Sequence, residues 1–498
     1  MDLFNNLIFG FSVAFSLQNL LYCLIGVMVG TLIGVLPGIG PLGTIAILMP
    51  ITYGVSPVGA LIMLAGIYYG AQYGGSTTAI LVNLPGETSA VVTCIDGYQM
   101  ARQGRAGPAL AIAAIGSFFA GTVGTLLIAL AGPPLADIAL KFSSAEYFSL
   151  MLMGLVAAAV LAQGDMVKSL AMVAVGLLLG LVGSDVNTGV QRFSFGMSEL
   201  SDGIGFIVVA VGVFAIGEII ANLGERQERR VFTAAVTHLF PSKDDMKRSV
   251  GPIVRGTAIG SFFGVLPGTG PAIASFASYM LEKKLAADPT RFGKGAIEGV
   301  AAPESANNAD AQCKFIPMLT LGLPASGVMA LMLGALTIQG IQPGPEVMTQ
   351  RPDLFWGLIA SMWIGNLMLV VLNLPLIGLW VKLLRVPYRL LFPAIMAFSA
   401  IGIYSVNSSS FEIYLTALFG IFGFVCMKLG FPPAPMLLGY VLGPMMEENL
   451  RRSMLMSGGD PSVFVTRPLS LAFIIATVLI LVVMVLPAVR AHRQEIAD

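Results

Sequence analysis

The sequence contains one sixteen-residue segment twice. Residues 26–41 read GVMVGTLIGVLPGIGP and residues 256–271 read GTAIGSFFGVLPGTGP, with nine identical positions at a constant offset of 230. Each copy predicts an apolar helix with glycine at every fourth position, which lets a second backbone approach closely. Each then reaches Pro-Gly-x-Gly-Pro, which interrupts a helix because proline has no amide hydrogen and glycine is costly to order. The duplication therefore predicts two related halves, each with a broken helix.

Composition puts these helices in a lipid bilayer. Hydrophobic residues make up 56% of the chain and charged residues 11%, against about a quarter charged in an average soluble domain. We therefore predict an all-α polytopic membrane protein. The 27 basic residues balance the 27 acidic ones, so no nucleic-acid partner is expected. The four cysteines and two histidines lack metal or redox spacing, so we expect no cofactor, no disulfide framework and no metal beyond a bound Na⁺.

Charge distribution divides the chain into three parts. Residues 1–223 are predicted to form a first membrane repeat, 224–251 a basic cytoplasmic linker and 252–498 a second membrane repeat. The linker is basic whereas the segment before the first span has no Lys or Arg, and this contrast favours an odd number of crossings and inverted repeats. Arg490 and Arg493 favour a cytoplasmic C-terminus. The start of the chain lacks a basic signal region, so retention in a bacterial cytoplasmic membrane is expected.

Short apolar segments beside the first break predict half-helices or re-entrant hairpins. Residues 42–53 and 57–69 are too short to cross a bilayer comfortably. Two polar segments, 72–78 (QYGGSTT) and 301–310 (AAPESANNAD), predict further helix breaks. The polar stretch 87–107 is predicted to reach water.

The two Pro-Gly breaks are the predicted substrate site. Unwound backbone persists in a membrane only where protein buries it or where it lines a watery cavity, and paired breaks are typical of secondary transporters. A helix that begins after such a break presents free N–H groups and its positive dipole end to an anion. The alternative is a structural kink. The predicted substrate contacts are Pro37, Gly38, Gly40, Pro267, Gly268, Thr269 and Gly270, with Ser76, Thr77, Asn307 and Asn308 from the polar segments.

The polar segments also predict a site for a coupling cation, because side-chain oxygens and freed carbonyls coordinate Na⁺ at helix breaks. The predicted ligands are Asn83, Ser305, Asn307, Asn308 and Asp310. The alternative is that these Ser and Asn side chains only cap broken helices.

Glu304 and Asp310 flank the second polar segment and are weaker candidates than the asparagine pair. Such a carboxylate could bind a cation, carry a proton or only interact with a helix dipole. Glu218 lies inside a predicted span and is expected to reach the headgroup zone near Arg226. No buried Arg or Lys is expected in the pocket, so backbone donors and a co-ion would supply its positive field.

Other functional classes fit less well. Residues 38–43 satisfy the dinucleotide fingerprint literally, but they follow a membrane helix rather than a strand. No nucleophile and base can be assembled, so an enzyme is not expected. A channel remains an alternative, although it needs a continuous polar pore rather than discrete clusters.

Several segments spread over about residues 30–455 resemble the large membrane subunit of the tripartite tricarboxylate transporter family. They include GVLPGIGPLGTIAILMPITYG, YYGAQYGGSTTAILVNLPGE, GVLPGTGPAIASFASYMLEKK, EGVAAPESANNADAQ and KLGFPPAPMLLGYVLGPMMEENLRRS. The resemblance implies Na⁺- or H⁺-driven uptake of carboxylates such as citrate, or of another organic acid such as an aromatic carboxylate, across the bacterial inner membrane. It implies two partners, a small four-helix membrane subunit and a periplasmic solute-binding protein, and an elevator-type architecture.

Overall fold

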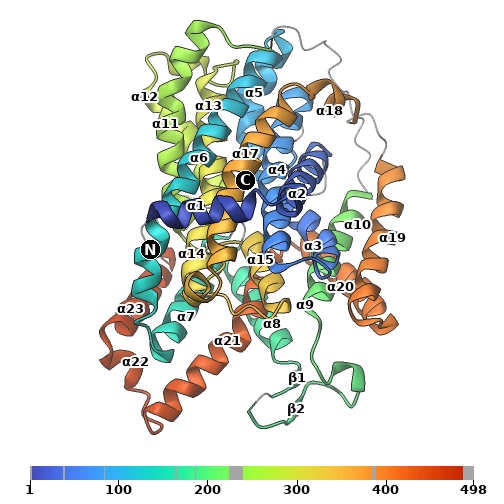
Figure 1. Cartoon of the computed structure of the whole chain (residues 1–498), viewed down its shortest axis with the longest axis vertical. Coiled ribbons are helices and arrows are strands. Elements are labelled where there is room, and N and C mark those ends of the chain that lie inside the picture. Colours follow the sequence, from blue (N-terminus) through green and yellow to red (C-terminus); the bar gives the residue numbers. More distant parts are fainter. Residues whose placement is uncertain are drawn as a thin grey trace.

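The computed structural model describes residues 3–36, 40–83, 85–162, 165–185, 187–223, 239–383 and 388–485, and most of these residues are helical (Figure 1). Among these residues, four helices are long and apolar enough to cross a membrane, namely Leu17–Val35, Ala106–Ala139, Pro352–Asn373 and Ser410–Lys428. The predicted all-α membrane class is therefore confirmed. The two strands found in the described part of the chain, β1 (Gly183–Ser184) and β2 (Gln191–Arg192), pair antiparallel in one connection.

The helices of the first part of the chain are α1 (Leu3–Ala14), α2 (Leu17–Val35), α3 (Pro41–Thr52), α4 (Pro57–Val82), η1 (Thr88–Ala90), α5 (Val91–Arg102), α6 (Ala106–Ala139), α7 (Ser144–Leu161), α8 (Met166–Gly180), η2 (Ser198–Leu200), α9 (Phe206–Ala210), the π-helical segment η3 (Val211–Ile216) and α10 (Gly217–Leu223).

Those of the second part are α11 (Lys243–Val265), α12 (Pro271–Leu285), η4 (Pro289–Arg291), α13 (Glu298–Cys313), α14 (Phe315–Leu321), α15 (Gly327–Ile338), α16 (Glu346–Gln350), α17 (Pro352–Asn373), α18 (Ile377–Leu383), α19 (Tyr388–Asn407), α20 (Ser410–Lys428), α21 (Ala434–Met456), α22 (Val463–Thr466) and α23 (Pro468–Val485).

The repeated glycines hold two equivalent helix pairs together. Gly26, Gly30 and Gly34 of α2 lie against the backbone of Met63, Ile67 and Ala71 of α4. Gly256, Gly260 and Gly264 of α11 lie in the same way against Ala302, Ala306 and Asp310 of α13. The partner positions on α4 and α13 differ by 239 in each case. Asn83 and Gly322, also 239 apart, both end a helix with positive φ, at 60° and 68°.

We expect Gly260→Ala to destabilise the protein by about 1–3 kcal/mol, the usual cost of overpacking. A Cβ at Gly260 would lie 2.1 Å from the carbonyl oxygen of Ala306, which is backbone and has no room to move. Gly251→Ala on the same helix is the control, because its Cβ would meet the flexible guanidinium of Arg255 at 3.1 Å. Thermal unfolding of the purified variants measures the difference, and equal melting temperatures would refute the close-packing argument.

The predicted polar breaks are wrong in position. Residues 57–69 do not form a half-helix, because α4 continues to Val82 through the QYGGSTT segment. Residues 301–310 likewise lie inside α13. The reason is that the small polar side chains form hydrogen bonds within the helix: the Ser76 and Thr78 hydroxyls donate to the carbonyls four residues earlier, at 3.1 and 3.3 Å. Gly74 packs against α2, and Gly75 packs against Gly86 and Glu87.

Residues 87–107 also do not simply reach water. Asp96 on α5 is fully buried. Its carboxylate accepts hydrogen bonds from the backbone N–H groups of Gly293, Gly295 and Ala296 at 2.8–2.9 Å and from the Tyr279 hydroxyl at 2.9 Å. Asp96 thereby joins α5 to the connection between α12 and α13, at the upper end of the molecule in Figure 1.

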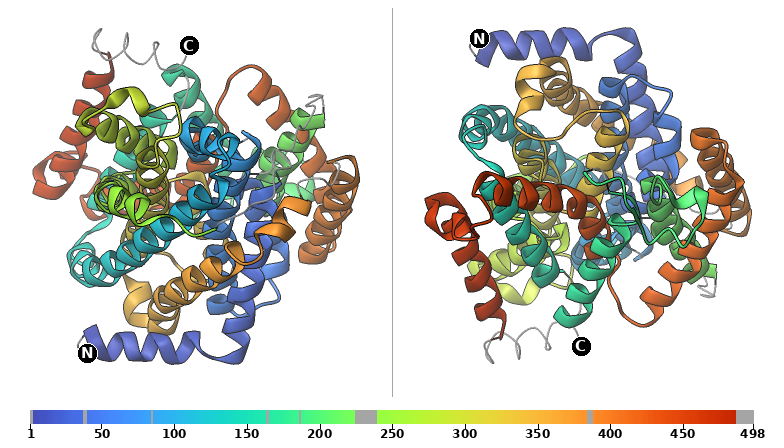
Figure 2. Two further views of the ribbon diagram at one scale, coloured as in Figure 1. Left: turned by 90° about the horizontal axis from the view of Figure 1, so that it is seen from above. Right: turned by 90° about the horizontal axis from the view of Figure 1, so that it is seen from below.

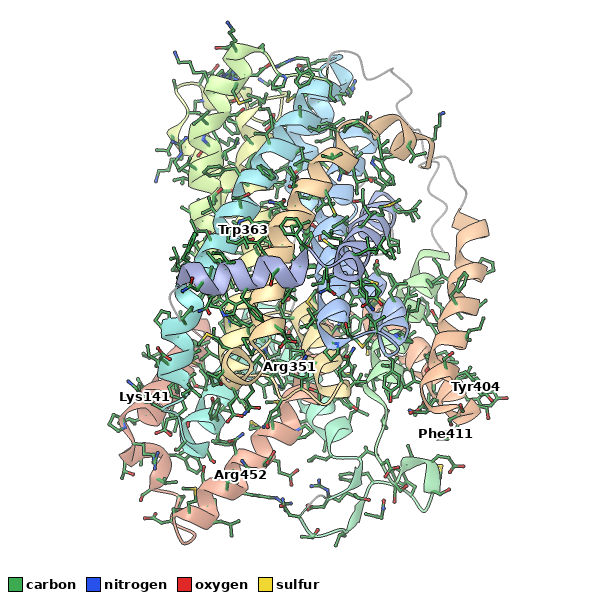
Figure 3. The ribbon with its side chains drawn as sticks, viewed as in Figure 1. Lys141, Arg351, Trp363, Tyr404, Phe411 and Arg452 are labelled. Atoms are coloured by element: carbon green, nitrogen blue, oxygen red, sulfur yellow. The ribbon has the colours of Figure 1, made fainter. Side chains whose placement is uncertain are left out.

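Further glycine contacts assemble the outer helices. Gly176 of α8 lies against the backbone of Met436 in α21, and Gly212 of η3 lies against Thr416 and Phe419 in α20. Helix α1 runs across α17, along one edge of the molecule in Figure 2. Lys141, Arg351 and Arg452 lie toward the lower end (Figure 3), away from α5 and α12.

At this lower end, Asp185 joins the connection that carries β1 and β2 to Arg451 of α21. Hydrogen bonds from the Asn187 backbone N–H (2.9 Å) and from Arg451 (2.7 Å) lower the pKa of Asp185 to about 2. A lowered folded-state pKa means that the stabilisation is fully present above the ordinary carboxyl pKa, near 4, and disappears as pH falls toward 2.

We therefore expect Asp185→Asn to lower amide-exchange protection of residues 187–192 at neutral pH. Wild type and variant should converge as pH falls from about 4 to about 2, because wild-type Asp185 then loses its charge. Asp202→Asn, an exposed carboxylate in the same connection, should leave protection unchanged at every pH. A wild type that keeps its advantage at pH 2 would contradict this role.

Candidate functional site

The two Pro-Gly breaks are brought to a common region by the segment between α14 and α15. The Gly268 N–H donates to the carbonyl of Ala325 at 2.9 Å. Gly327, which begins α15, lies so close to Leu42 of α3 that a Cβ there would be 2.6 Å from Leu42 Cδ1. On the other side, α12 packs against η1. The start of α3 thus lies beside the start of α15, and the second break lies beside the segment that leads into α15. Predicted contacts Pro37 and Gly38 lie outside the described residues.

The glycines at the second break have different structural roles. Gly268 has φ of +80°, and a Cβ there would lie 2.4 Å from Ala158 Cα, so this position requires glycine. The Thr269 hydroxyl lies 2.5 Å from the Phe263 carbonyl and 2.8 Å from that of Leu266, so it holds the break itself.

The N-cap glycines of α3 and α12 face open space. A Cβ at Gly270 would meet nothing within 4 Å, and one at Gly40 would meet Glu218 Oε1 at 3.9 Å. Pro267 precedes the second break and Pro271 begins α12. A ligand at the start of α12 would therefore meet bare main chain and the positive end of a helix dipole, whereas at the start of α3 the Glu218 carboxylate already accepts the Gly40 N–H.

Glu218 contacts the first break rather than the membrane surface. Its Oε1 accepts the Gly40 N–H at 3.4 Å. Glu218 is the second residue of α10, which follows η3, and the π-helical turn of η3 shifts the register of the helix. Arg226, the partner expected from sequence, lies outside the described residues.

Glu304 of α13 is the centre of a buried polar cluster. Its side chain is 1% exposed. One oxygen accepts the Ser76 hydroxyl of α4 at 2.5 Å, and the other accepts the Thr93 hydroxyl of α5. Because α4 and α5 belong to the first predicted half and α13 to the second, Glu304 joins the two.

A second carboxylate, Glu87, lies just before η1. It accepts hydrogen bonds from the Ser89 hydroxyl and, at 3.2 Å, from the Asn307 amide. Asn307 lies three residues after Glu304 and three before Asp310 on α13, so this bond holds Glu87 beside the part of α13 that carries both carboxyl groups. Three carboxyl groups, Glu87, Glu304 and Asp310, therefore share one region.

Lys314 corrects the expectation that no basic side chain is buried in the pocket. It is 0% exposed and pairs with Asp310, four residues earlier and equally buried. The sequence carries a signal for this pair, since Lys314 follows Asp310 at helical spacing just before an apolar run. Thr93 and Glu87 had no such signal, because only the fold brings α5 and η1 to α13.

The remaining predicted residues are separated by the structure. Asn308 donates to Ser117 of α6 at 2.7 Å and to the Glu304 carbonyl at 3.0 Å. The Ser305 and Thr77 hydroxyls bond carbonyls of their own helices. Asn83 ends α4 with an exposed side chain. Ser76, Thr77 and Ser117 line a cavity of about 20 Å³, enough for one water molecule.

Comparison with known proteins identifies the family. Residues 20–438 match the Tripartite tricarboxylate transporter TctA family. The chain belongs to this family. It is 58% identical over 496 residues to the "Uncharacterized 52.8 kDa protein in TAR-I ttuC' 3'region" of Agrobacterium vitis, covering all of this chain and 99% of that protein. It is 57% identical over 237 residues to the "Uncharacterized protein in TAR-II ttuC' 3'region" of the same organism, covering 48% of this chain and 98% of that protein. No solved structure matches.

Membership makes this TctA-family chain a component of a tripartite transporter that works with membrane and binding-protein partners. Among the described residues no group of three or more His, Cys, Asp or Glu side chains is arranged to hold a metal ion. The four cysteines are free. The buried polar cluster around Glu304 is the candidate site for the transported ligand or ion.

Proposed function

We propose that this protein is the permease of a secondary active uptake system for carboxylates of the tricarboxylate or dicarboxylate class, such as citrate, driven by Na⁺ or H⁺. The observation that carries the proposal is the open N-cap glycine of α12, in a region where the segment before α15 contacts both Pro-Gly breaks, together with a buried cluster of carboxyl groups. Helix starts attract an anionic substrate, and uncompensated carboxylates attract a cation. A site that takes both is what symport requires.

The proposal includes architecture and sidedness. The pairs α2–α4 and α11–α13 would be the cores of two inverted repeats, and they would move together, with both breaks, against a fixed scaffold. Arg105, Arg248 and Arg291 lie at one end of the molecule, where α5, α11 and α13 meet. They are held there by ion pairs with Asp245 and Glu298. The positive-inside rule assigns this end to the cytoplasm. Arg490 and Arg493 favour a cytoplasmic C-terminus by the same rule.

Delivery of the substrate by a periplasmic solute-binding protein, with a small four-helix membrane subunit as second partner, follows from the family. The membrane in question would be the bacterial inner membrane. A permease for another organic acid, for example an aromatic carboxylate, is the alternative, because main-chain donors recognise the carboxylate rather than the rest of the molecule.

Reconstitution tests the function. The full three-component system in proteoliposomes should accumulate a labelled carboxylate only with an inward Na⁺ or H⁺ gradient. It should also exchange labelled for unlabelled substrate without a gradient, because alternating access permits counterflow. Downhill flux without counterflow would instead indicate an anion channel. A panel of tricarboxylates, dicarboxylates and aromatic acids, with Na⁺ and pH varied independently, identifies substrate and coupling ion.

A further inference from the structure

Charge balance in the cluster around Glu304 is incomplete. The described residues bring three carboxyl groups together, and Lys314 is the one basic side chain in contact with any of them. Ionised carboxylates inside a membrane protein are costly unless paired. Further positive charge must therefore enter this region when all three are ionised.

Two buried side-chain oxygen atoms of α13 lack a hydrogen-bond partner among the described residues. Asn307 is 1% exposed and Asp310 0% exposed, yet Oδ1 of each accepts nothing from the described residues. The other atom of each side chain is used, Asn307 Nδ2 on Glu87 and Asp310 Oδ2 on Lys314. The two residues are three positions apart on α13 and so share one face. A buried acceptor left unsatisfied costs about 1–3 kcal/mol, so this pair calls for a ligand.

We propose that Asn307 and Asp310, with Glu87, bind a desolvated Na⁺ ion, and that Lys314 is a tethered cation that competes with Na⁺ for Asp310. This rests on the proposed function and specifies its coupling ion. An amide oxygen and carboxylate oxygens are ligands suited to a hard cation. A proton would satisfy one acceptor, whereas Na⁺ satisfies the amide and the carboxylates together.

This competition gives the site two states, and in each of them a cation neutralises the charge of Asp310. Without Na⁺, the Lys314 ammonium neutralises Asp310. With Na⁺ bound, Lys314 is released from Asp310 and its charge becomes available to an anionic substrate at the adjacent helix starts. Na⁺ binding and carboxylate binding would in this way strengthen each other, as reciprocal linkage requires.

Direct binding of radioactive sodium to the purified full-length protein tests the proposal, in choline chloride of constant ionic strength at pH 8. We expect saturable Na⁺ binding by wild type. The Na⁺ affinity of Asn307→Ala should be weaker than that of wild type by about tenfold or more, the loss expected for one buried polar ligand. Asn19→Ala is the matched control. Asn19 is a buried asparagine of α2 that bonds the Val13 carbonyl at 2.9 Å, and its loss should leave the affinity unchanged. Lys314→Met should tighten binding severalfold, because the competitor is gone.

Three results would overturn the site: absent Na⁺ binding by wild type, equal affinity in wild type and Asn307→Ala, or weaker binding in Lys314→Met that retains its wild-type melting temperature. A melting temperature that rises on acidification but does not respond to Na⁺ would assign the region to H⁺ and equally reject the proposal. Because the assay needs no substrate, Na⁺ binding without carboxylate uptake would refute the proposed function, whereas uptake without Na⁺ binding would refute this inference.

Discussion

Gly270→Val will insert and fold normally but lose carboxylate uptake. Gly270 is the N-cap of α12, and a Cβ there meets no atom within 4 Å, so the added side chain has room in the empty protein. The same side chain would occupy the space through which a carboxylate reaches the first N–H groups of α12. Losing hydrogen bonds to a charged ligand costs about 1.5–3 kcal/mol each, which corresponds to about tenfold or more in affinity.

Gly268→Ala is the informative counterpart two residues earlier. Its φ of +80° and the 2.4 Å approach to Ala158 Cα predict that the alanine variant fails to fold or loses stability. Uptake per molecule of membrane-inserted protein, measured together with the melting temperature, separates the two effects. Normal uptake by Gly270→Val would show that the start of α12 is not a substrate site.

Glu304→Gln should keep the fold and raise the cation concentration required for half-maximal uptake by about tenfold or more. Glutamine has nearly the same shape and can still accept one of the hydroxyls of Ser76 and Thr93. What it removes is a buried negative charge close to Glu87. Two unit charges about 4–8 Å apart interact by on the order of 2–4 kcal/mol at the effective dielectric of a protein site.

Glu282→Gln is the control, because it removes a buried carboxylate that lies outside the cluster around Glu304. Glu282 is 4% exposed but pairs with Arg255, which is 43% exposed and can turn to solvent when its partner is removed. This variant should retain the wild-type cation requirement. If Glu304→Gln behaves like Glu282→Gln, the charge of Glu304 has no part in cation coupling and its role is to join α13 to α4 and α5.

The breaks at 36–41 and 266–271 illustrate what local chemistry can predict. Proline and glycine act on the backbone of their own segment, so helix ends at Val35 and Val265 and new starts at Pro41 and Pro271 followed from residue type alone. The polar segments illustrate the opposite. Their serines and threonines can either break a helix or bond back to it, and close packing of α4 on α2 and of α13 on α11 decided for the helix.

By itself, the sequence determined the membrane class, the glycine-lined helix pairs, the two helix starts and the family. These depend on composition and on interactions between near neighbours. Tertiary structure alone decided that Glu304 would meet Ser76 and Thr93, that Glu87 would meet Asn307, and that Lys314 would be buried with Asp310 in this cluster. Such contacts join residues up to 228 positions apart. Their energy depends on burial and on mutual distance, which no pattern along the chain encodes.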